Sequence, residues 1–139
     1  STLLFTPAAA VIAASLVSLP LFVQVTRNAL EAIPRDLLEA AQVLGATRWQ
    51  IFRYIALPLI GNGICIGLLL AFVRAMGEFG ATLMVAGNIP GRTQTMSLAV
   101  YSAVQAGNAA RASTLALYLT AMGSLATWAG LRLRGRWQV

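Results

Sequence analysis

Arg74 and Glu78 are the two charged residues of this chain whose spacing is best suited to chemistry. Four positions apart on a helix, their side chains lie on the same face, so the guanidinium and the carboxylate can pair. They follow a long apolar run, and ionisable groups at membrane depth usually face a cavity or a partner. Counted from Tyr54 at about 1.5 Å per residue, Arg74 lies about 30 Å along the helix axis. A plain ion pair at the far edge of a membrane is therefore the alternative.

The remaining residue types do not predict an enzyme. The chain has no histidine and only four acidic residues, three of which fall before position 40. No Ser–His pair or pair of carboxylates can be assembled from them, and without lysine there is no Gly-rich loop of the phosphate-binding type. The single cysteine, Cys65, lies inside an apolar run and indicates no disulfide framework. We therefore expect no catalytic residue, no metal ligand and no cofactor bound by the chain itself.

The composition indicates a membrane protein. Of the 139 residues, 58% are hydrophobic and 10% are charged, whereas a soluble domain carries about 25% charged residues. Three uncharged runs are long enough to cross a membrane, at residues 1–26, 54–73 and 112–131. Each has the roughly 20 residues that a hydrocarbon core about 30 Å thick requires, and backbone in lipid must pair internally, as in a helix. The predicted fold class is an all-α integral membrane protein with about three transmembrane helices in one domain, residues 1–139.

The arginines are distributed unevenly around these runs. Seven lie before the second run or after the third, against three between the second and third. The seven are Arg27, Arg35, Arg48, Arg53, Arg132, Arg134 and Arg136. The positive-inside rule then places the first connection and the C-terminus in the cytoplasm, with Trp128 and Trp137 at the membrane interface. Because no aromatic residues alternate with the arginines, the net charge of +6 indicates membrane lipid rather than nucleic acid.

Prolines and polar residues modify the pattern of spans. Pro7, Pro20 and Pro58 interrupt the first two runs and should kink them. Residues 93–110 are uncharged but include seven Thr, Ser, Gln or Asn residues. We expect an amphipathic helix there, on the extracytoplasmic side or lining a cavity, rather than a fourth span.

A short polar helix is predicted at residues 36–46, between the first two spans. Asp36 can cap its N-terminus, with Glu39 in the capping-box position three residues on. Gly45 suits the left-handed position that ends a helix. A helix of about eight residues is marginal by itself, so it needs a partner surface or the protein's own helix ends. An ordinary interfacial helix is the alternative interpretation.

A second capping box is predicted directly after this glycine. Thr47 and Gln50 have the spacing of the box, which begins a new helix leading into the second span. The two helices would meet at a sharp corner. A rigid helix fixed at such a corner can turn the motion of a partner into tilt of the span.

This region resembles the Glu-Ala-Ala loop of the permeases of ATP-binding-cassette importers. The matching residues, all in register, are Glu39-Ala40-Ala41, Gly45, Ile55, Leu57 and Pro58. The resemblance implies that a cytoplasmic ATPase subunit docks on this loop and binds the ATP itself. The residues that would make this contact are Glu39, Ala40, Ala41, Gly45 and Arg48.

The stretch after the second span is similar to the molybdate-type permeases of that group. Gly77-Glu78-Phe79-Gly80 is common to the oxyanion permeases, and Asn88-Ile89-Pro90-Gly91 favours molybdate. The resemblance implies the C-terminal half of a five- or six-span permease in a bacterial inner membrane. Its partners would be ATPase subunits, a second permease copy and an extracytoplasmic oxyanion-binding protein. A sulfate or tungstate permease, or a membrane scaffold that transports nothing, is the alternative.

An oxyanion path requires hydrogen-bond donors and modest positive potential. The candidates for a gate or a pathway are Arg74, Glu78, Thr82, Asn88, Arg92 and Thr93. Glu78 has the wrong sign for an anion ligand, so a gate or structural role suits it better. For the threonines the alternative is local structure, because Pro90-Gly91 predicts a turn and Thr93 could cap the next helix.

Overall fold

The computed structural model describes residues 4–134, with the side chains of residues 4–132, and every regular element in that part of the chain is helical. The elements are α1 (Pro7–Glu31), α2 (Arg35–Val43), α3 (Arg48–Ile51), η1 (Phe52–Ala56), α4 (Leu57–Met76), α5 (Gly80–Ala86), α6 (Met96–Gln105) and α7 (Ala109–Arg134). Three helical stretches are long and apolar enough to cross a membrane: Pro7–Glu31, Arg48–Met76 and Ala109–Arg132. The predicted all-α class and the three predicted spans are confirmed.

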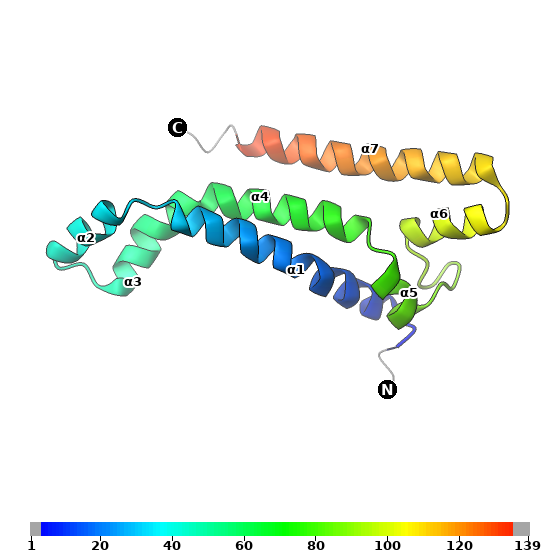
Figure 1. Cartoon of the computed structure of the whole chain (residues 1–139), viewed down its shortest axis with the longest axis horizontal. Coiled ribbons are helices and arrows are strands. Elements are labelled where there is room, and N and C mark those ends of the chain that lie inside the picture. The colour runs from blue at the N-terminus through cyan, green and yellow to red at the C-terminus, as the bar shows by residue number, and fades with distance from the viewer. Residues whose placement is uncertain (1–3, 135–139) are drawn as a thin grey trace.

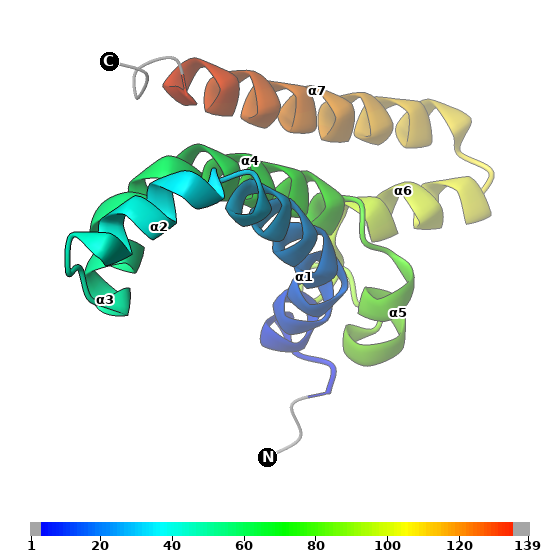
Figure 2. The same ribbon diagram turned by 60° about the vertical axis from the view of Figure 1, so that its left-hand side comes forward.

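The first span begins later and ends later than predicted. Pro7 opens α1 at its first turn instead of interrupting it, and the Thr6 hydroxyl accepts a hydrogen bond from the Ala9 N–H (3.2 Å). Proline suits this position because its missing N–H would have no helical partner there. Pro20 does lie inside α1, and Figure 2 shows the helix bending along its length.

The second span is one continuous helical rod made of α3, η1 and α4. Its five residues Phe52–Ala56 form a π-helix immediately ahead of Pro58. Proline cannot donate to the carbonyl four residues earlier and its ring crowds that carbonyl. A wider π turn accommodates both effects, and it explains how the rod passes a proline without ending.

Helices α1 and α4 pack closely along most of their length (Figure 1). Gly63 lies directly against the Ala29 side chain, so that even a methyl group at position 63 would overlap it, and Gly67 lies against Phe22. Where the two helices reach the α2 end, Ile33, Ala56 and Ile60 form a buried apolar cluster. Glycines at a helix crossing let the two backbones approach, as is common among membrane helices.

Helix α7 returns antiparallel along α4, and α6 runs beside the first part of α7 (Figures 1 and 2). α6 covers Met96–Gln105 rather than the predicted 93–110. At about 1.5 Å per residue it is roughly 15 Å long, too short to span. The prediction that this segment is not a fourth span is confirmed.

The corner made by α2 and α3 lies at one end of the molecule, and α5 and the α6–α7 turn lie toward the other; α7 runs from that turn back in the direction of the corner and ends alongside α4 (Figure 1). That the arginines of the first connection and of the end of α7 share the cytoplasmic side stays a prediction. Arg136, Trp137 and residues 1–3 of the first run lie outside the described residues.

Candidate functional site

Helix α2 begins at Arg35, and the predicted cap at Asp36 is wrong. Pro34 occupies the N-cap with φ −59° and ψ 129°, and no side chain caps the helix. The proline ring fixes φ near the helical value, so the chain can turn into the helix directly after Pro34. Asp36 then lies in the first turn, where a carboxylate still interacts favourably with the helix dipole.

Gly45 ends α2 in the left-handed conformation, as predicted, with φ +83°. Its N–H donates to the Gln42 carbonyl (2.9 Å), and the Ala46 N–H donates to the Ala41 carbonyl (3.0 Å). These two bonds form a Schellman motif, which satisfies the last carbonyls of a helix. The corner is therefore a defined structure rather than a flexible link.

The predicted capping box at the start of α3 is confirmed. The Gln50 N–H donates to the Thr47 hydroxyl (3.3 Å), and the Thr47 N–H donates to the Gln50 side-chain oxygen (2.8 Å). Leu38 of α2 packs against the cluster of Ile33, Ala56 and Ile60. The protein's own helix ends therefore supply packing for a helix too short to be stable alone.

The side chains assigned to ATPase contact lie mostly on the surface of this corner. Glu39, Ala40, Gly45 and Arg48 are exposed, whereas Ala41 is buried. Large apolar side chains are exposed around them, and the most exposed are Val43 (87%), Leu44 (86%), Tyr54 (74%) and Trp49 (68%). A hollow of about 400 Å³ lies beside Gly45, between Leu44 and Tyr54. These side chains are available for contact with a partner or with lipid.

At the other end, Arg74 and Glu78 form the predicted pair, with guanidinium and carboxylate 2.9 Å apart. The Glu78 side chain is 9% exposed and the Arg74 side chain 47%. The carboxylate also accepts a hydrogen bond from the Ala81 N–H at the start of α5 (3.1 Å). That backbone bond and the Arg74 guanidinium lower the pKa of Glu78 against the opposing effect of burial. Glu78 is therefore an ionised structural joint between α4 and α5.

The same joint is tied to α6. The Ser97 hydroxyl donates to the Glu78 carbonyl (2.8 Å), and the rings of Phe79 and Tyr101 lie 4.7 Å apart. A displacement of the C-terminal end of α4 would therefore also displace α6.

The loop between α5 and α6 is held by its own polar side chains. The Thr93 hydroxyl accepts from the Ile89 N–H (3.1 Å), and Pro90 and Gly91 lie in the predicted turn. Thr93 does not cap α6; Thr95 does, accepting from the Leu98 N–H (3.4 Å). Thr93 is instead turned back into the loop and buried.

Asn88 links this loop to α6. Its amide donates to the Ser102 hydroxyl (2.7 Å), and its carbonyl oxygen accepts from Gln94 (2.8 Å). Gln94, Ser97 and Ser102 were not among the predicted candidates. The count of polar residues in 93–110 was the only signal in the sequence, and it could not say which of them would meet Asn88 or Glu78.

The six predicted gate or pathway residues do not converge on one cavity. Arg74 and Glu78 pair, Asn88 and Thr93 stabilise the loop, and Arg92 is exposed on the turn. Thr82 is 1% exposed on α5, and its hydroxyl has no hydrogen-bond partner among the described residues. Across residues 4–132, no group of three His, Cys, Asp or Glu side chains could hold a metal ion.

Taken together, the helices define a multi-pass membrane protein with a rigid, exposed corner at one end and a hydrogen-bonded polar cluster at the other. The sequence matches the family described as "Binding-protein-dependent transport system inner membrane component" over residues 1–138. The chain belongs to this family of inner-membrane transport components.

Several named relatives are similar to it. The chain is 48% identical over 105 residues to the putative molybdenum transport system permease protein YvgM of Bacillus subtilis, covering 76% of this chain and 46% of that protein. It is 47% identical over 104 residues to the molybdenum transport system permease protein ModB of Escherichia coli K12, covering 75% and 45%. The sulfate transport system permease protein CysT of E. coli is 36% identical over 114 residues, covering 82% and 41%.

The chain spans about half the length of the curated relatives that it matches. No solved structure matches it.

Proposed function

We propose that this chain is the membrane-crossing part of an ATP-driven oxyanion importer and that its anion is molybdate. The identity of 41–48% to proteins named as molybdenum permeases supports this substrate. Sulfate and tungstate are the alternatives within the same group, and the identity to proteins named as sulfate permeases is 36–41%. The chain would bind no nucleotide; ATPase subunits, a second permease copy and an extracytoplasmic oxyanion-binding protein would complete the transporter.

The observation that carries the proposal is the joint between α2 and the second span. α2 is fixed to α3 by the Schellman bonds at Gly45 and the capping box at Thr47. α3 continues without interruption through η1 and α4 to Met76. A push on α2 would therefore tilt a rod about 44 Å long, at roughly 1.5 Å per residue over its 29 residues. Hinge-type motion of a rigid element is a common way to alternate access.

The orientation is part of the proposal. The corner carries Arg35, Arg48 and Arg53, and the positive-inside rule places such an end in the cytoplasm. The exposed Glu39 and Ala40 then face the compartment where an ATPase subunit can reach them. In the variant Glu39→Cys, the new thiol should react with a membrane-impermeant maleimide only when the reagent has access to the cytoplasmic side of the membrane. Labelling of this thiol from outside intact cells would contradict the orientation.

The substrate is tested by uptake of radiolabelled molybdate into cells that lack their own molybdate uptake. We expect uptake to depend on this permease and to be displaced more strongly by unlabelled molybdate than by sulfate. Stronger displacement by sulfate would reassign the substrate, and no uptake of any oxyanion would favour the scaffold alternative.

The coupling role is tested by Glu39→Gln, with Glu31→Gln as a matched control. Both carboxylates are exposed at the same end of the molecule, but Glu31 lies on α1 and pairs with Arg27 (2.7 Å). We expect Glu39→Gln alone to weaken co-purification with the ATPase subunit and to lower uptake. Equal effects of the two variants would show that Glu39 has no particular part in docking.

A further inference from the structure

A charged pair on α1 shows where the hydrocarbon core begins beside α4. Arg27 and Glu31 pair at 2.7 Å, and their side chains are 74% and 60% exposed. Charged side chains inside the core are costly and almost always face protein or a cavity, so this exposed pair lies at the headgroup level. The Ala29 side chain, between the two in sequence, lies directly against Gly63 of α4. The core therefore begins close to Gly63 rather than at the start of α4.

Helix α7 gives a similar level from its own side of α4. Its long apolar run ends at Arg132, whose side chain is exposed. Gly130, two residues earlier, lies directly against the Leu69 side chain. Both long helices that pack on α4 therefore become charged beside residues 63–69.

Measured from this level, α4 ends inside the membrane. It continues to Met76, which is about 10 Å beyond Leu69 and about 20 Å beyond Gly63 at about 1.5 Å per residue. A hydrocarbon core is about 30 Å thick. α1 and α7 do cover that distance, because their ends at Pro7 and Ala109 each lie about 32 Å from the same level.

Helix α6 covers the depth that α4 leaves open. It continues roughly in line with α4 and runs beside the first part of α7 (Figures 1 and 2). Its ten residues, Met96–Gln105, are about 15 Å long, which is half of a core about 30 Å thick. α5 fills the same depth on the other side, where Val85 packs against Ala9 and Ala10 near the start of α1.

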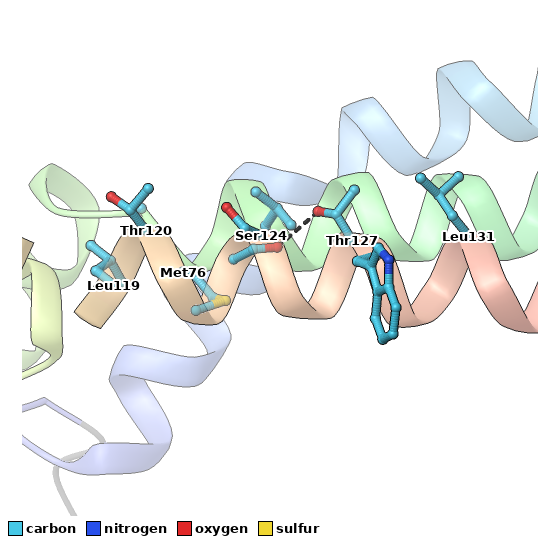
Figure 3. A pocket seen from close by; sticks show the side chains of 10 residues that line it. Met76, Leu119, Thr120, Ser124, Thr127 and Leu131 are labelled. Atoms are coloured by element: carbon cyan, nitrogen blue, oxygen red, sulfur yellow. Dashed lines mark hydrogen bonds between the residues drawn. The ribbon is translucent and has the colours of Figure 1, made fainter. Parts of the chain in front are cut away.

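A hollow of about 560 Å³ marks the interruption on the α7 side (Figure 3). Its α4 wall consists of Val73, Met76 and Gly77, which are the last turn of that helix and the residue after it. The α7 wall runs from Leu119 to Leu131 and so begins near the middle of α7. The hollow therefore places the end of α4 beside the middle of a helix that is long enough to cross the whole membrane.

The chain between α4 and α6 is polar and only partly helical. Residues 87–95 are loop and turn, where Asn88 and Gln94 are half-buried and Arg92 is exposed. At the end of α4, the Arg74 side chain is 47% exposed. Irregular backbone at membrane depth is tolerated only where protein covers it or where it lines a water-filled cavity. The two exposed guanidinium groups favour water, because removing such a charge from water is costly.

We propose that α4 and α6 are the two halves of one broken membrane crossing. Residues 77–95 between them line a water-filled path through the half of the membrane away from the α2–α3 corner. Under the proposed function, on which only this step rests, the oxyanion takes this path. Arg74 and Arg92 give the path a positive potential that suits an anion, whereas the Glu78 carboxylate is buried and paired.

Spin labels on α7 test the depth of the break in the full chain, reconstituted into lipid vesicles with Cys65→Ser as background. Leu117, Met122 and Leu131 are 71%, 53% and 53% exposed, so a labelled cysteine at each should leave the packing intact. Power saturation with oxygen and with a neutral nickel chelate gives the depth of each label. We expect the label of Met122→Cys to be the deepest, about 13 Å deeper than that of Leu131→Cys at about 1.5 Å per residue.

The opposite profile would overturn the broken crossing. If the label of Leu131→Cys is the deepest and that of Leu117→Cys is open to the nickel chelate, α4 crosses the membrane alone. α6 would then lie outside the membrane beside the first part of α7.

Arg92→Cys tests the water-filled path, with Leu117→Cys as the matched control. Both positions are exposed, and both lie on the side of the break away from the corner. We expect the nickel chelate to relax the label at position 92 severalfold more than the label at position 117, and oxygen to show the reverse preference. Relaxation of the label at position 92 mainly by oxygen would place it against lipid, and relaxation by neither reagent would place it under a protein cover. Either result would overturn the path.

These measurements require neither the ATPase nor the anion, so they fail independently of the uptake experiment. Loss of the expected molybdate uptake with this depth profile intact would refute the proposed substrate and leave the broken crossing standing. Normal uptake with the opposite profile would do the reverse.

Discussion

The substitution Gly45→Ala should weaken the corner between α2 and α3, which we propose couples the ATPase subunit to the second span. Gly45 has φ +83°, and a β-carbon there would meet no atom within 4 Å. The cost of Gly45→Ala is therefore backbone strain alone, without a steric clash. A left-handed residue other than glycine costs about 1–2 kcal/mol.

That cost is large for a motif held by two hydrogen bonds. The bonds from the Gly45 and Ala46 N–H groups form only while position 45 stays left-handed. A change of about 1–2 kcal/mol shifts the closed and open forms of the corner by a factor of about 5–30. The rod and α2 would then lose their fixed angle in a substantial share of molecules.

Gly107 provides a matched control. It has φ +70° and also meets no atom within 4 Å, but it lies at the α6–α7 turn, far from the corner (Figure 1). Gly107→Ala should carry a similar strain energy. Thermal denaturation in detergent measures the stability of both variants, and oxyanion uptake measures coupling.

We expect both alanines to lower stability similarly and only Gly45→Ala to lower uptake severalfold. Asparagine tolerates the left-handed region, so Gly45→Asn should recover much of the loss. The reasoning is refuted if Gly107→Ala impairs uptake as strongly as Gly45→Ala at equal expression, or if Gly45→Ala loses stability but transports normally.

Three further outcomes follow from the packing and the outer joint. Glu78→Gln should destabilise the protein by about 1 kcal/mol, because Arg74 loses its charged partner but is half-exposed and stays solvated. Thermal denaturation measures this loss, and an unchanged melting temperature would contradict it. Since the pKa of Glu78 is lowered in the folded protein, its stabilising effect is present at neutral pH and is lost as the pH falls through the folded value. A pH series of melts should therefore show a smaller acid loss in Glu78→Gln than in the parent. Gly63→Ala should lower the stability of the protein by about 1–3 kcal/mol, because the new methyl group overlaps Ala29. Gly61→Ala on the same helix meets no neighbouring atom and should be neutral or stabilising. Equal melting temperatures of the two variants would show that α1 moves aside freely.

The corner and the spans could be predicted from the sequence because their signals are local. Gly45 and the Thr47–Gln50 box each satisfy backbone groups within a few residues, and the spans depend on run length. The predicted cap at Asp36 failed for a local reason as well. Pro34 fixes its own φ near the helical value, and neither the proline nor Asp36 indicates by residue type alone at which of the two positions the helix starts.

Tertiary contacts account for what could not be predicted. The π-helix ahead of Pro58 could not be predicted, since the same proline could have ended the helix instead. The bonds from Asn88 to Ser102 and from Ser97 to Glu78 join residues 14 and 19 positions apart. Sequence showed donors and acceptors in both segments, but only the folded chain pairs them.

These long-range bonds show how the two ends of the molecule could communicate. The rod that starts at the corner ends at Met76, and Glu78 follows it by two residues. Glu78 is bound to Arg74 on the rod, to the first turn of α5 and to Ser97 of α6. A tilt of the rod must therefore either carry α5 and α6 with it or break this joint. Under the proposed function, Glu78 need not touch the anion at all. Its buried carboxylate binds α4 and α5, and its backbone carbonyl accepts from Ser97 of α6, so the residue would pass the motion of α2 to the loop around Asn88. This accounts for a negative charge in the stretch proposed for an anion pathway, which a ligand role could not explain.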